Sequence, residues 1–187
     1  NDLWLYDIAA NTWTFMGGSD QPNHPGVFGE LRVPAAENQP GARAHAATWC
    51  DFDGNFWLYG GSGGRADLWK FDKASNMWTW MHGSQTSDVQ PVYGIKGEAS
   101  NLSTPGSRSL AATWSDDQGN LWLYGGTPNN ISGRSDLWKY NTSTNQWTWM
   151  GTSGPAVFGV QGQPHPDNSP GPRFESMVGK DLEGNFL

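Results

Sequence analysis

The sequence predicts an all-β protein built from repeated four-stranded antiparallel meanders. Short runs of aromatic and β-branched residues recur along the 187-residue chain, and Gly, Asn and Asp separate them, as strands and hairpin turns require. The same residues return at a spacing of 65, which identifies an internal repeat. Apolar residues nowhere keep the spacing of a helical face for three turns. Together these observations favour a β fold over a helical one.

Three arginines mark the repeat, and each follows a Pro-Gly-x triplet: Arg43, Arg108 and Arg173. The triplet Asp-Leu-Trp also recurs, with spacings of 65 and then 69, beginning at Asp2, Asp67 and Asp136. The four additional residues lie in the connection TPNNIS. Because insertions are tolerated in loops, the segments on either side of this connection are expected to be structural elements.

Each repeat contains four predicted strands in a fixed order. The first strand follows the arginine, at 44–49, 109–114 and 174–179. A tight turn with Gly leads to the second strand, at 56–61 and 121–126. After a variable loop comes the third strand, at 2–7, 67–72 and 136–141. A five-residue turn that ends in Asn leads to the fourth strand, at 12–16, 77–81 and 146–150.

A four-stranded meander cannot bury both of its faces alone, so such units stack or close into a ring. In this chain the second strand ends in two glycines, and an aromatic residue, six residues and a Trp follow later. These residues are Gly60, Gly61, Phe71 and Trp78, then Gly125, Gly126, Tyr140 and Trp147. The pattern resembles the kelch repeat, including the long-loop kelch arrays of predicted secreted proteins and the central-domain repeats of galactose oxidase. The resemblance implies kelch-type β-propeller blades, although kelch units have about 50 residues.

The resemblance divides the chain into two complete blades and two half blades. Residues 1–42 hold the third and fourth strands of one blade and a long loop. Residues 43–107 and 108–172 each hold a blade and a long loop, and 173–187 hold a first strand and the start of a second. Either the chain is part of a longer protein, or the half blades of separate copies complete one another head to tail, in a ring or a filament.

Charge and hydropathy argue against two classes of partner. The chain carries 18 carboxylates against 11 Lys and Arg, a net charge of −7, whereas nucleic-acid binding requires a basic surface. No apolar run approaches the roughly 20 residues of a membrane helix, so membrane insertion is not expected. Cys50 is the single cysteine, so the chain cannot form an internal disulfide.

No catalytic or metal site is expected within the chain. The resemblance to galactose oxidase implies a copper site with a Cys–Tyr pair, a second Tyr and two His ligands. Here Cys50 lies on a predicted first strand, and the four histidines lack the spacing of paired metal ligands. The turn sequence DFDGN resembles the start of a calcium loop, but a hairpin turn with Gly also explains it. We therefore expect no enzyme activity and no cofactor.

Three sets of recurring residues have competing interpretations. Trp78 and Trp147 recur at one strand position, which favours packing between blades over stacking on sugar rings. The arginines 43, 108 and 173 are expected to tie each blade to its neighbour, with Asp2, Asp67 or Asp136 as ion-pair partner. The alternative is a ring of guanidinium groups that faces a ligand. Three aromatic residues of the long loops are candidates for partner contact or loop anchoring: Phe28, Tyr93 and Phe158.

Three N-glycosylation sequons lie in predicted loops or turns, at Asn101, Asn130 and Asn141, and favour a secreted or cell-surface location. The sequence therefore predicts a non-catalytic structural scaffold in a larger secreted or surface protein. Its long-loop face contacts protein or glycan partners, or further copies of the chain. The alternatives are the propeller part of a galactose-oxidase-like carbohydrate oxidase with metal ligands outside this chain, a carbohydrate-binding module, and an intracellular adaptor.

Overall fold

The described residues of this computed structural model, 2–128 and 131–186, form an all-β protein. Within these ranges, eleven strands pair antiparallel in three sheets and no segment is helical, as the sequence predicts. The first sheet is the hairpin of β1 (Asp2–Asp7) and β2 (Thr12–Gly18). The described part of the chain therefore contains no helix that could cross a membrane.

The second sheet is a meander in which each strand pairs with its neighbour in sequence. Its strands are β3 (Ala47–Cys50), β4 (Phe56–Tyr59), β5 (Ala66–Asp72) and β6 (Met77–Ser84). The third sheet repeats this order and adds one short strand at its edge. Its strands are β7 (Ala99–Ser100), β8 (Ala112–Ser115), β9 (Leu121–Tyr124), β10 (Leu137–Asn141) and β11 (Gln146–Gly151).

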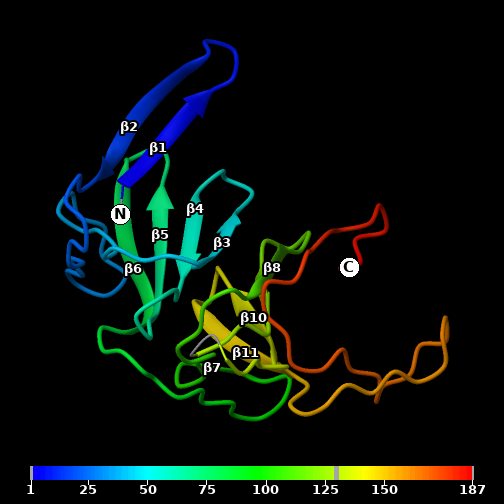
Figure 1. The fold of residues 1–187 in the computed structure, drawn as a ribbon. Coiled ribbons are helices and arrows are strands. Elements are labelled where there is room, and N and C mark those ends of the chain that lie inside the picture. The colour runs from blue at the N-terminus through cyan, green and yellow to red at the C-terminus, as the bar shows by residue number, and fades with distance from the viewer. Residues whose placement is uncertain (1, 129–130, 187) are drawn as a thin grey trace.

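The three sheets follow one another along an open arc (Figure 1). The first strands of the second and third sheets, β3 and β8, lie side by side, and two hydroxyl groups join them. Thr113 Oγ1 donates to the carbonyl oxygen of Thr48 at 3.0 Å, and Ser115 Oγ donates to that of Cys50 at 3.1 Å. β6 and β11 lie on the far side of their sheets, so the two sheets converge at their first strands.

The long connections are more ordered than the sequence predicts. Each closes on itself through an antiparallel bridge at the same place: Val27 with Gln39, Val92 with Thr104, and Val157 with Ser169. The first two then run along the outer strand of the sheet that follows. Ala35 bridges Trp78 of β6, and β7 pairs with β11. Each of these connections thus covers an edge strand, whose free backbone groups would otherwise invite pairing with another chain.

The strand predicted at 174–179 does not form. The described pairing around this segment consists of two bridges, Arg134 with Arg173 and Lys180 with Phe186. The segment makes isolated contacts instead: the N–H of Glu175 donates to the carbonyl oxygen of Leu110 at 3.1 Å, and the indole of Trp114 donates to the carbonyl oxygen of Gly179 at 3.0 Å. Single hydrogen bonds of this kind do not make the continuous ladder that a strand requires.

Aromatic side chains form the core between the second and third sheets. Trp57 of β4 contacts Tyr140 of β10 with 5.8 Å between ring centroids, and Tyr59 contacts Trp147 at 5.4 Å. All four rings are 2% exposed or less. Because each ring removes a large apolar area from water, this packing contributes strongly to stability. Trp78 occupies the position of Trp147 in the second sheet and is also buried.

In each repeat, an aspartate stabilises the tight turn between the first and second strands by accepting hydrogen bonds. In the turn between β3 and β4, Asp51 accepts hydrogen bonds from two backbone N–H groups, the amide of Asn55 and the indole of Trp57. Asp116 and Asp181 are held in the same way by the amide of the Asn four residues later. The leading aspartate of each turn is therefore satisfied by N–H donors, which supports the hairpin interpretation over a cation site.

The two glycines that end the second strand let the next sheet approach closely. Gly60 and Gly61 have φ values of 64° and 104°. The N–H of Gly61 donates to the carbonyl oxygen of Arg108 at 2.9 Å, and a side chain on Gly60 would collide with the same oxygen. The same arrangement recurs between Gly125, Gly126 and Arg173. These glycines are therefore required by a backbone approach as well as by a left-handed conformation.

Gly60→Ala should destabilise the fold more than Gly54→Ala. Both glycines have left-handed φ values, 64° and 77°. A Cβ at Gly54 meets no atom within 4 Å, whereas one at Gly60 meets the Arg108 carbonyl oxygen. By urea unfolding we expect a loss of about 1 kcal/mol for Gly54→Ala and about 3 kcal/mol or more for Gly60→Ala. Equal losses would contradict the close approach of the sheets.

Candidate functional site

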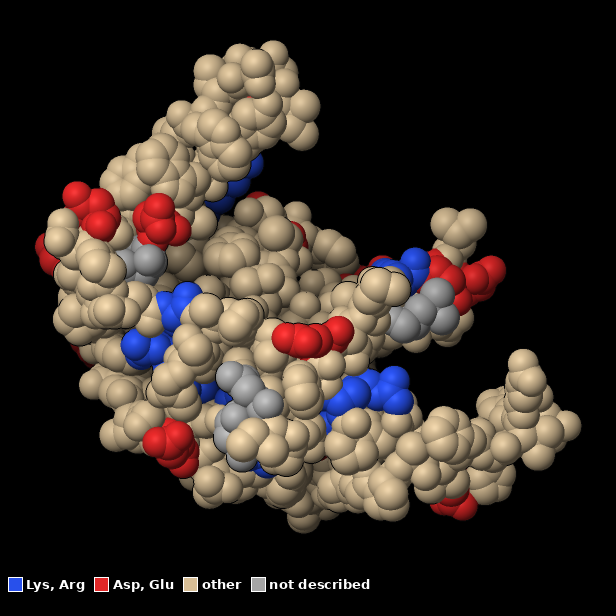
Figure 2. Space-filling view, viewed as in Figure 1, with Lys and Arg blue, Asp and Glu red and all other residues tan. Residues whose placement is uncertain are grey.

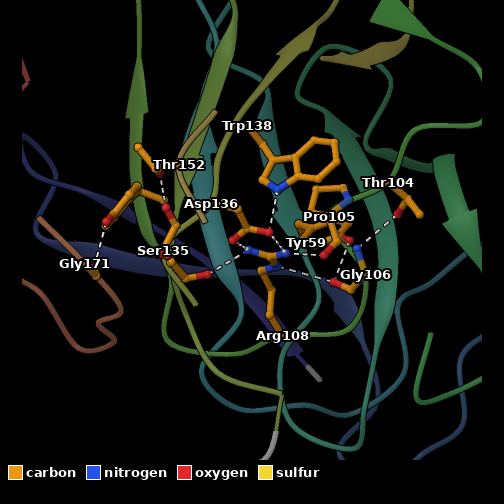
Figure 3. Close-up of polar contacts among 12 residues, drawn as sticks. Tyr59, Thr104, Pro105, Gly106, Arg108, Ser135, Asp136, Trp138, Thr152 and Gly171 are labelled. Carbon is orange, nitrogen blue, oxygen red and sulfur yellow. Dashed lines mark hydrogen bonds and ion pairs between the residues drawn. The ribbon is translucent and has the colours of Figure 1, made fainter. Parts of the chain in front are cut away.

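The recurring arginine lies at a buried junction, shown for Arg108 in Figure 3. Its guanidinium group binds the Asp136 carboxylate with two parallel hydrogen bonds, of 2.7 and 2.9 Å. The indole of Trp138 donates to the same carboxylate at 2.9 Å. The Arg108 and Asp136 side chains are 0% and 1% exposed. Burial alone would raise the pKa of Asp136, but Arg108 and Trp138 together lower it below its usual value.

The remaining donors of Arg108 bind backbone carbonyl groups. Nη1 donates to Gly125 at 2.8 Å, Nη2 donates to Pro105, and Nε donates to Gly106 at 3.5 Å. The hydroxyl of Tyr59, from the preceding sheet, also donates to the Gly106 carbonyl at 3.0 Å, and burial raises the pKa of this tyrosine. The junction therefore joins three segments of chain, and its charges are fully compensated.

Arg43 forms the same junction in the second sheet. Its guanidinium group binds Asp67 with two hydrogen bonds of 2.7 Å and the Gly60 carbonyl at 3.0 Å, and Trp69 donates to the same aspartate at 2.7 Å. The expected aspartates are thus the partners of both arginines. However, each ion pair lies within one sheet, and the link to the preceding sheet is made by the backbone carbonyl of Arg108.

The alternative of a ligand-facing guanidinium ring is not supported by these two arginines, because their side chains are 5% exposed or less. Arg173 differs from them. It is exposed, and its guanidinium group donates only to the carbonyl groups of Pro170 and Gly171 among the described contacts. None of the ion pairs between described residues includes Arg173.

The aromatic residues of the long connections have two different roles. Phe28 packs on Trp69 and Trp80, with ring centroids 5.0 and 5.3 Å apart. Tyr93 packs in the same way on Trp138 and Trp149, at 5.5 and 5.1 Å. Both rings are half-buried and anchor their connections to the following sheet, so they are not free for partner contact. Phe158, the third member of the set, is 83% exposed.

The hairpin β1–β2 carries an exposed set of four aromatic rings. We call it the aromatic face: Trp4, Tyr6, Trp13 and Phe15. Trp4 lies opposite Phe15 and Tyr6 opposite Trp13, with ring centroids 5.2 and 4.9 Å apart. Their exposed fractions run from 40% for Tyr6 to 66% for Trp13. The repeat shows that these positions correspond to buried or partly buried positions of the other sheets. The structure shows in addition that the described residues leave the four rings exposed.

The third sheet has an apolar hollow of about 380 Å³ at the opposite end of the arc. Trp114, Tyr124 and Leu137 line it from the sheet, and Met177 and Phe186 line it from the C-terminal segment. Phe186 stacks on Trp114 with 5.2 Å between ring centroids. Sequence reasoning missed this hollow because it is formed by segments far apart in the chain.

The sequons differ in their surroundings. Asn101 is exposed beside β7, and its side-chain oxygen accepts a hydrogen bond from Gln146 at 3.1 Å. Asn141 ends β10, and its side-chain oxygen accepts from the N–H groups of Ser143 and Thr144, which shapes the turn to β11. Asn130 lies outside the described residues. Asn101 is therefore the sequon whose structure best suits a glycan.

Within residues 2–128 and 131–186, no three His, Cys, Asp or Glu side chains are placed to hold a metal ion. His82 of β6 is buried beside Tyr140, with 6.3 Å between ring centroids. Burial, and secondarily the charge of Arg32, lower the pKa of His82 to about 4. Its imidazole is therefore neutral at pH 7.

No family model and no curated protein matches the chain. Among solved structures, 86 chains match it. One of these, the structure of YjhT, has a TM-score of 0.41 and 23% sequence identity. The match covers 69% of this chain and 31% of that chain, so this chain spans about a third of that protein's length.

Arg108→Ala should destabilise the protein far more than Arg173→Ala. Removal of Arg108 leaves the buried Asp136 carboxylate without its counter-charge, which costs about 3 to 5 kcal/mol. Arg173 is exposed and binds carbonyl groups only, so its loss should cost less than about 1 kcal/mol. The free energy of unfolding, measured with urea, tests both. An unchanged value for Arg108→Ala would refute the structural role of the junction.

Stability should fall between pH 6.5 and 4 because of His82. The unfolded chain binds a proton at this histidine below pH 6.5, whereas the folded chain binds it only near pH 4. Acidification through this window should lower the free energy of unfolding by about 2 to 3 kcal/mol. The neutral variant His82→Gln should lose that part of the dependence. A variant with the same pH profile as the parent would show that His82 is not responsible.

Proposed function

We propose that the chain is a kelch-type β-propeller segment with two complete blades and two half blades. In this proposal the second and third sheets are successive blades, and the hairpin β1–β2 is half of another. The convergence of the sheets at β3 and β8, with β6 and β11 on the far side, supports this arrangement. So does the arginine junction, which recurs at the start of each meander.

The proposed function is that of a non-catalytic scaffold. The main support for this proposal is that the recurring charged side chains form their hydrogen bonds and ion pairs with other groups of the same chain. Arg108 and Asp136 bind each other in the core, and Asp116 binds the donors of its own turn. A catalytic acid, base or nucleophile must instead face a pocket that admits a substrate. The repeats therefore build a frame rather than a reaction centre.

The proposed scaffold belongs to a secreted or cell-surface protein and contacts protein or glycan partners through its long connections. These connections carry many exposed apolar side chains: Leu31, Val33, Ile95, Leu102, Phe158 and Val160. The exposed sequon Asn101 lies beside Leu102. Exposed apolar side chains on loops held by a rigid frame are typical of binding surfaces.

A carbohydrate-binding module is a second candidate, and one observation favours it. The aromatic face presents Trp4 and Trp13 at 48% and 66% exposure. Rings with open faces stack on apolar surfaces, including those of sugars. A module of this kind would use the hairpin β1–β2, whereas the scaffold uses the long connections, so the two candidates differ in the surface that binds.

Cross-linking at two exposed lysines tests whether partners bind the long connections or the short turns. Lys96 is exposed in the connection before the third sheet, and Lys73 is exposed in the turn between β5 and β6. A membrane-impermeant, amine-reactive cross-linker applied to intact cells of the native source should join Lys96 to other surface proteins. Lys73 serves as the matched control, and mass spectrometry identifies the cross-linked peptides.

Cross-links that appear only after cell lysis would overturn the extracellular location. Cross-links at Lys73 without any at Lys96 would overturn contact through the long connections. In either case the fold of the chain is a separate matter, because the unfolding experiments on Gly60 and Arg108 test it independently.

A further inference from the structure

Two recurring arginines depart from the pattern on which the proposed scaffold rests. Arg65 and Arg134 each stand two residues before the aspartate of an Asp-Leu-Trp triplet. Neither arginine takes part in an ion pair between described residues. Both carboxylate oxygens of each aspartate are already bound, by Arg43 in one repeat and Arg108 in the other. Each repeat therefore places two guanidinium groups near a single carboxylate.

The guanidinium group of Arg65 is half-buried and only partly satisfied. Its Nη2 donates to the carbonyl oxygen of Ala42 at 3.2 Å, and its Nε is buried without a hydrogen-bond partner. Burial and the charge of Arg43 both lower the pKa of Arg65, so its positive charge is unfavourably placed within the chain itself. An arginine nevertheless stays charged at pH 7. The group therefore carries a positive charge that no acidic side chain of its surroundings neutralises.

Arg134 repeats this arrangement in the third sheet. Its Nε is likewise buried without a partner, and the hydrogen bonds described for this residue use its backbone alone. Its charge helps to lower the pKa of Asp136, which places it near the junction of Arg108. The same atom thus lacks a partner in both complete repeats. The hydrogen bonds of the fold do not account for this second arginine.

Arg65 borders a hollow of about 270 Å³, and the other polar side chains that line it are Asp67 and residues 84–87. Residues 84–87, with the sequence Ser-Gln-Thr-Ser, end β6 and begin the second long connection. The hydroxyl groups of Ser84 and Thr86 bond each other at 2.8 Å, so one of their two hydrogens can still donate. The Gln and the second Ser are exposed. The hollow therefore combines one unpaired positive charge with several neutral donors.

We propose that Arg65 binds a carboxylate group of a ligand in this hollow, and that Arg134 repeats the interaction in the next sheet. The planar guanidinium group matches a carboxylate in shape, and one unpaired charge matches a group with one negative charge. Residues 84–87 donate to the oxygens that Arg65 leaves unbound. Asp67 is compatible with the ligand, because Arg43 neutralises it. This ligand site goes beyond the proposed scaffold.

The overall charge of the chain makes such a site depend on local contacts. With a net charge of −7, the chain as a whole repels acids. Figure 2 shows that Lys and Arg side chains nevertheless reach the surface in several separate places on the face turned to the viewer. A carboxylate is therefore held by individual basic groups and not by a general attraction to the protein.

Titration with sodium acetate at constant ionic strength tests the site with a carboxylate alone. In the 15N-labelled protein, the backbone amide signals of residues 84–87 should shift and reach saturation. Arg65→Gln should weaken this response at least tenfold, because it removes the charge and the planar pair of donors. Lys73→Gln makes the same change of charge on an exposed turn and should respond like the parent.

A hexaglutamate peptide distinguishes two sources of the carboxylate, a small acid in solution and a chain that carries carboxylates in series. A peptide that spans both sites should bind at least tenfold more tightly than acetate, and Arg134→Gln should then weaken it at least tenfold, as Arg65→Gln does. An affinity equal to that of acetate would assign the sites to small acids.

The urea midpoint separates binding from folding. Arg65→Gln should keep the midpoint of the parent, because the side chain makes one described hydrogen bond and no ion pair. Signals of residues 84–87 that respond to neither acetate nor the peptide would overturn the proposal, as would an equal response in folded Arg65→Gln. The proposed function fails separately, through cross-linking at Lys96 and Lys73, so the two failures are distinguishable.

Discussion

The buried pair of Arg108 and Asp136, with its counterpart Arg43 and Asp67, is the interaction on which the described fold depends. Removing two charges from water is costly, and the cost is offset only when every donor and acceptor finds a partner. Here the guanidinium group meets one carboxylate and three carbonyl groups, and these acceptors come from different segments. The pair therefore fixes the start of the first strand against the third strand and the end of the second. The carbonyl group of the same arginine then fixes the distance to the preceding sheet.

The elements set by local chemistry could be predicted from the sequence. The four strands of each complete meander form within a few residues of the predicted limits, and the Gly and Asn residues of the turns have the left-handed φ values that their types suggest. The aspartate partners of the arginines also followed from the repeat. The sequence could not predict that each ion pair lies within one sheet, because the spacing of residues does not show whether an arginine binds the aspartate of its own sheet or that of the neighbouring sheet.

Features that depend on contact between distant segments could not be predicted. Phe28, Tyr93 and Phe158 are equivalent in sequence, yet the first two are anchored on a following sheet and the third is exposed. Trp13 and Trp147 are likewise equivalent, with exposed fractions of 66% and 0%. A repeat assigns the same residue to each position, whereas burial is decided by what lies next to it in space. The differences between equivalent residues therefore locate the surfaces available to a partner.

The edge cover that the first two long connections provide has a consequence for how the protein is made. Ala35 lies beside β6 and β7 lies beside β11, so each cover precedes, along the chain, the sheet that it protects. Because a ribosome releases the chain from its N-terminus, the cover has already emerged when its edge strand is synthesised. The last strand of each meander can therefore pair at once with a segment of its own chain that has already been synthesised. Because an unpaired edge strand is open to strands of other chains, this order of synthesis shortens the time for which the edges of β6 and β11 are open.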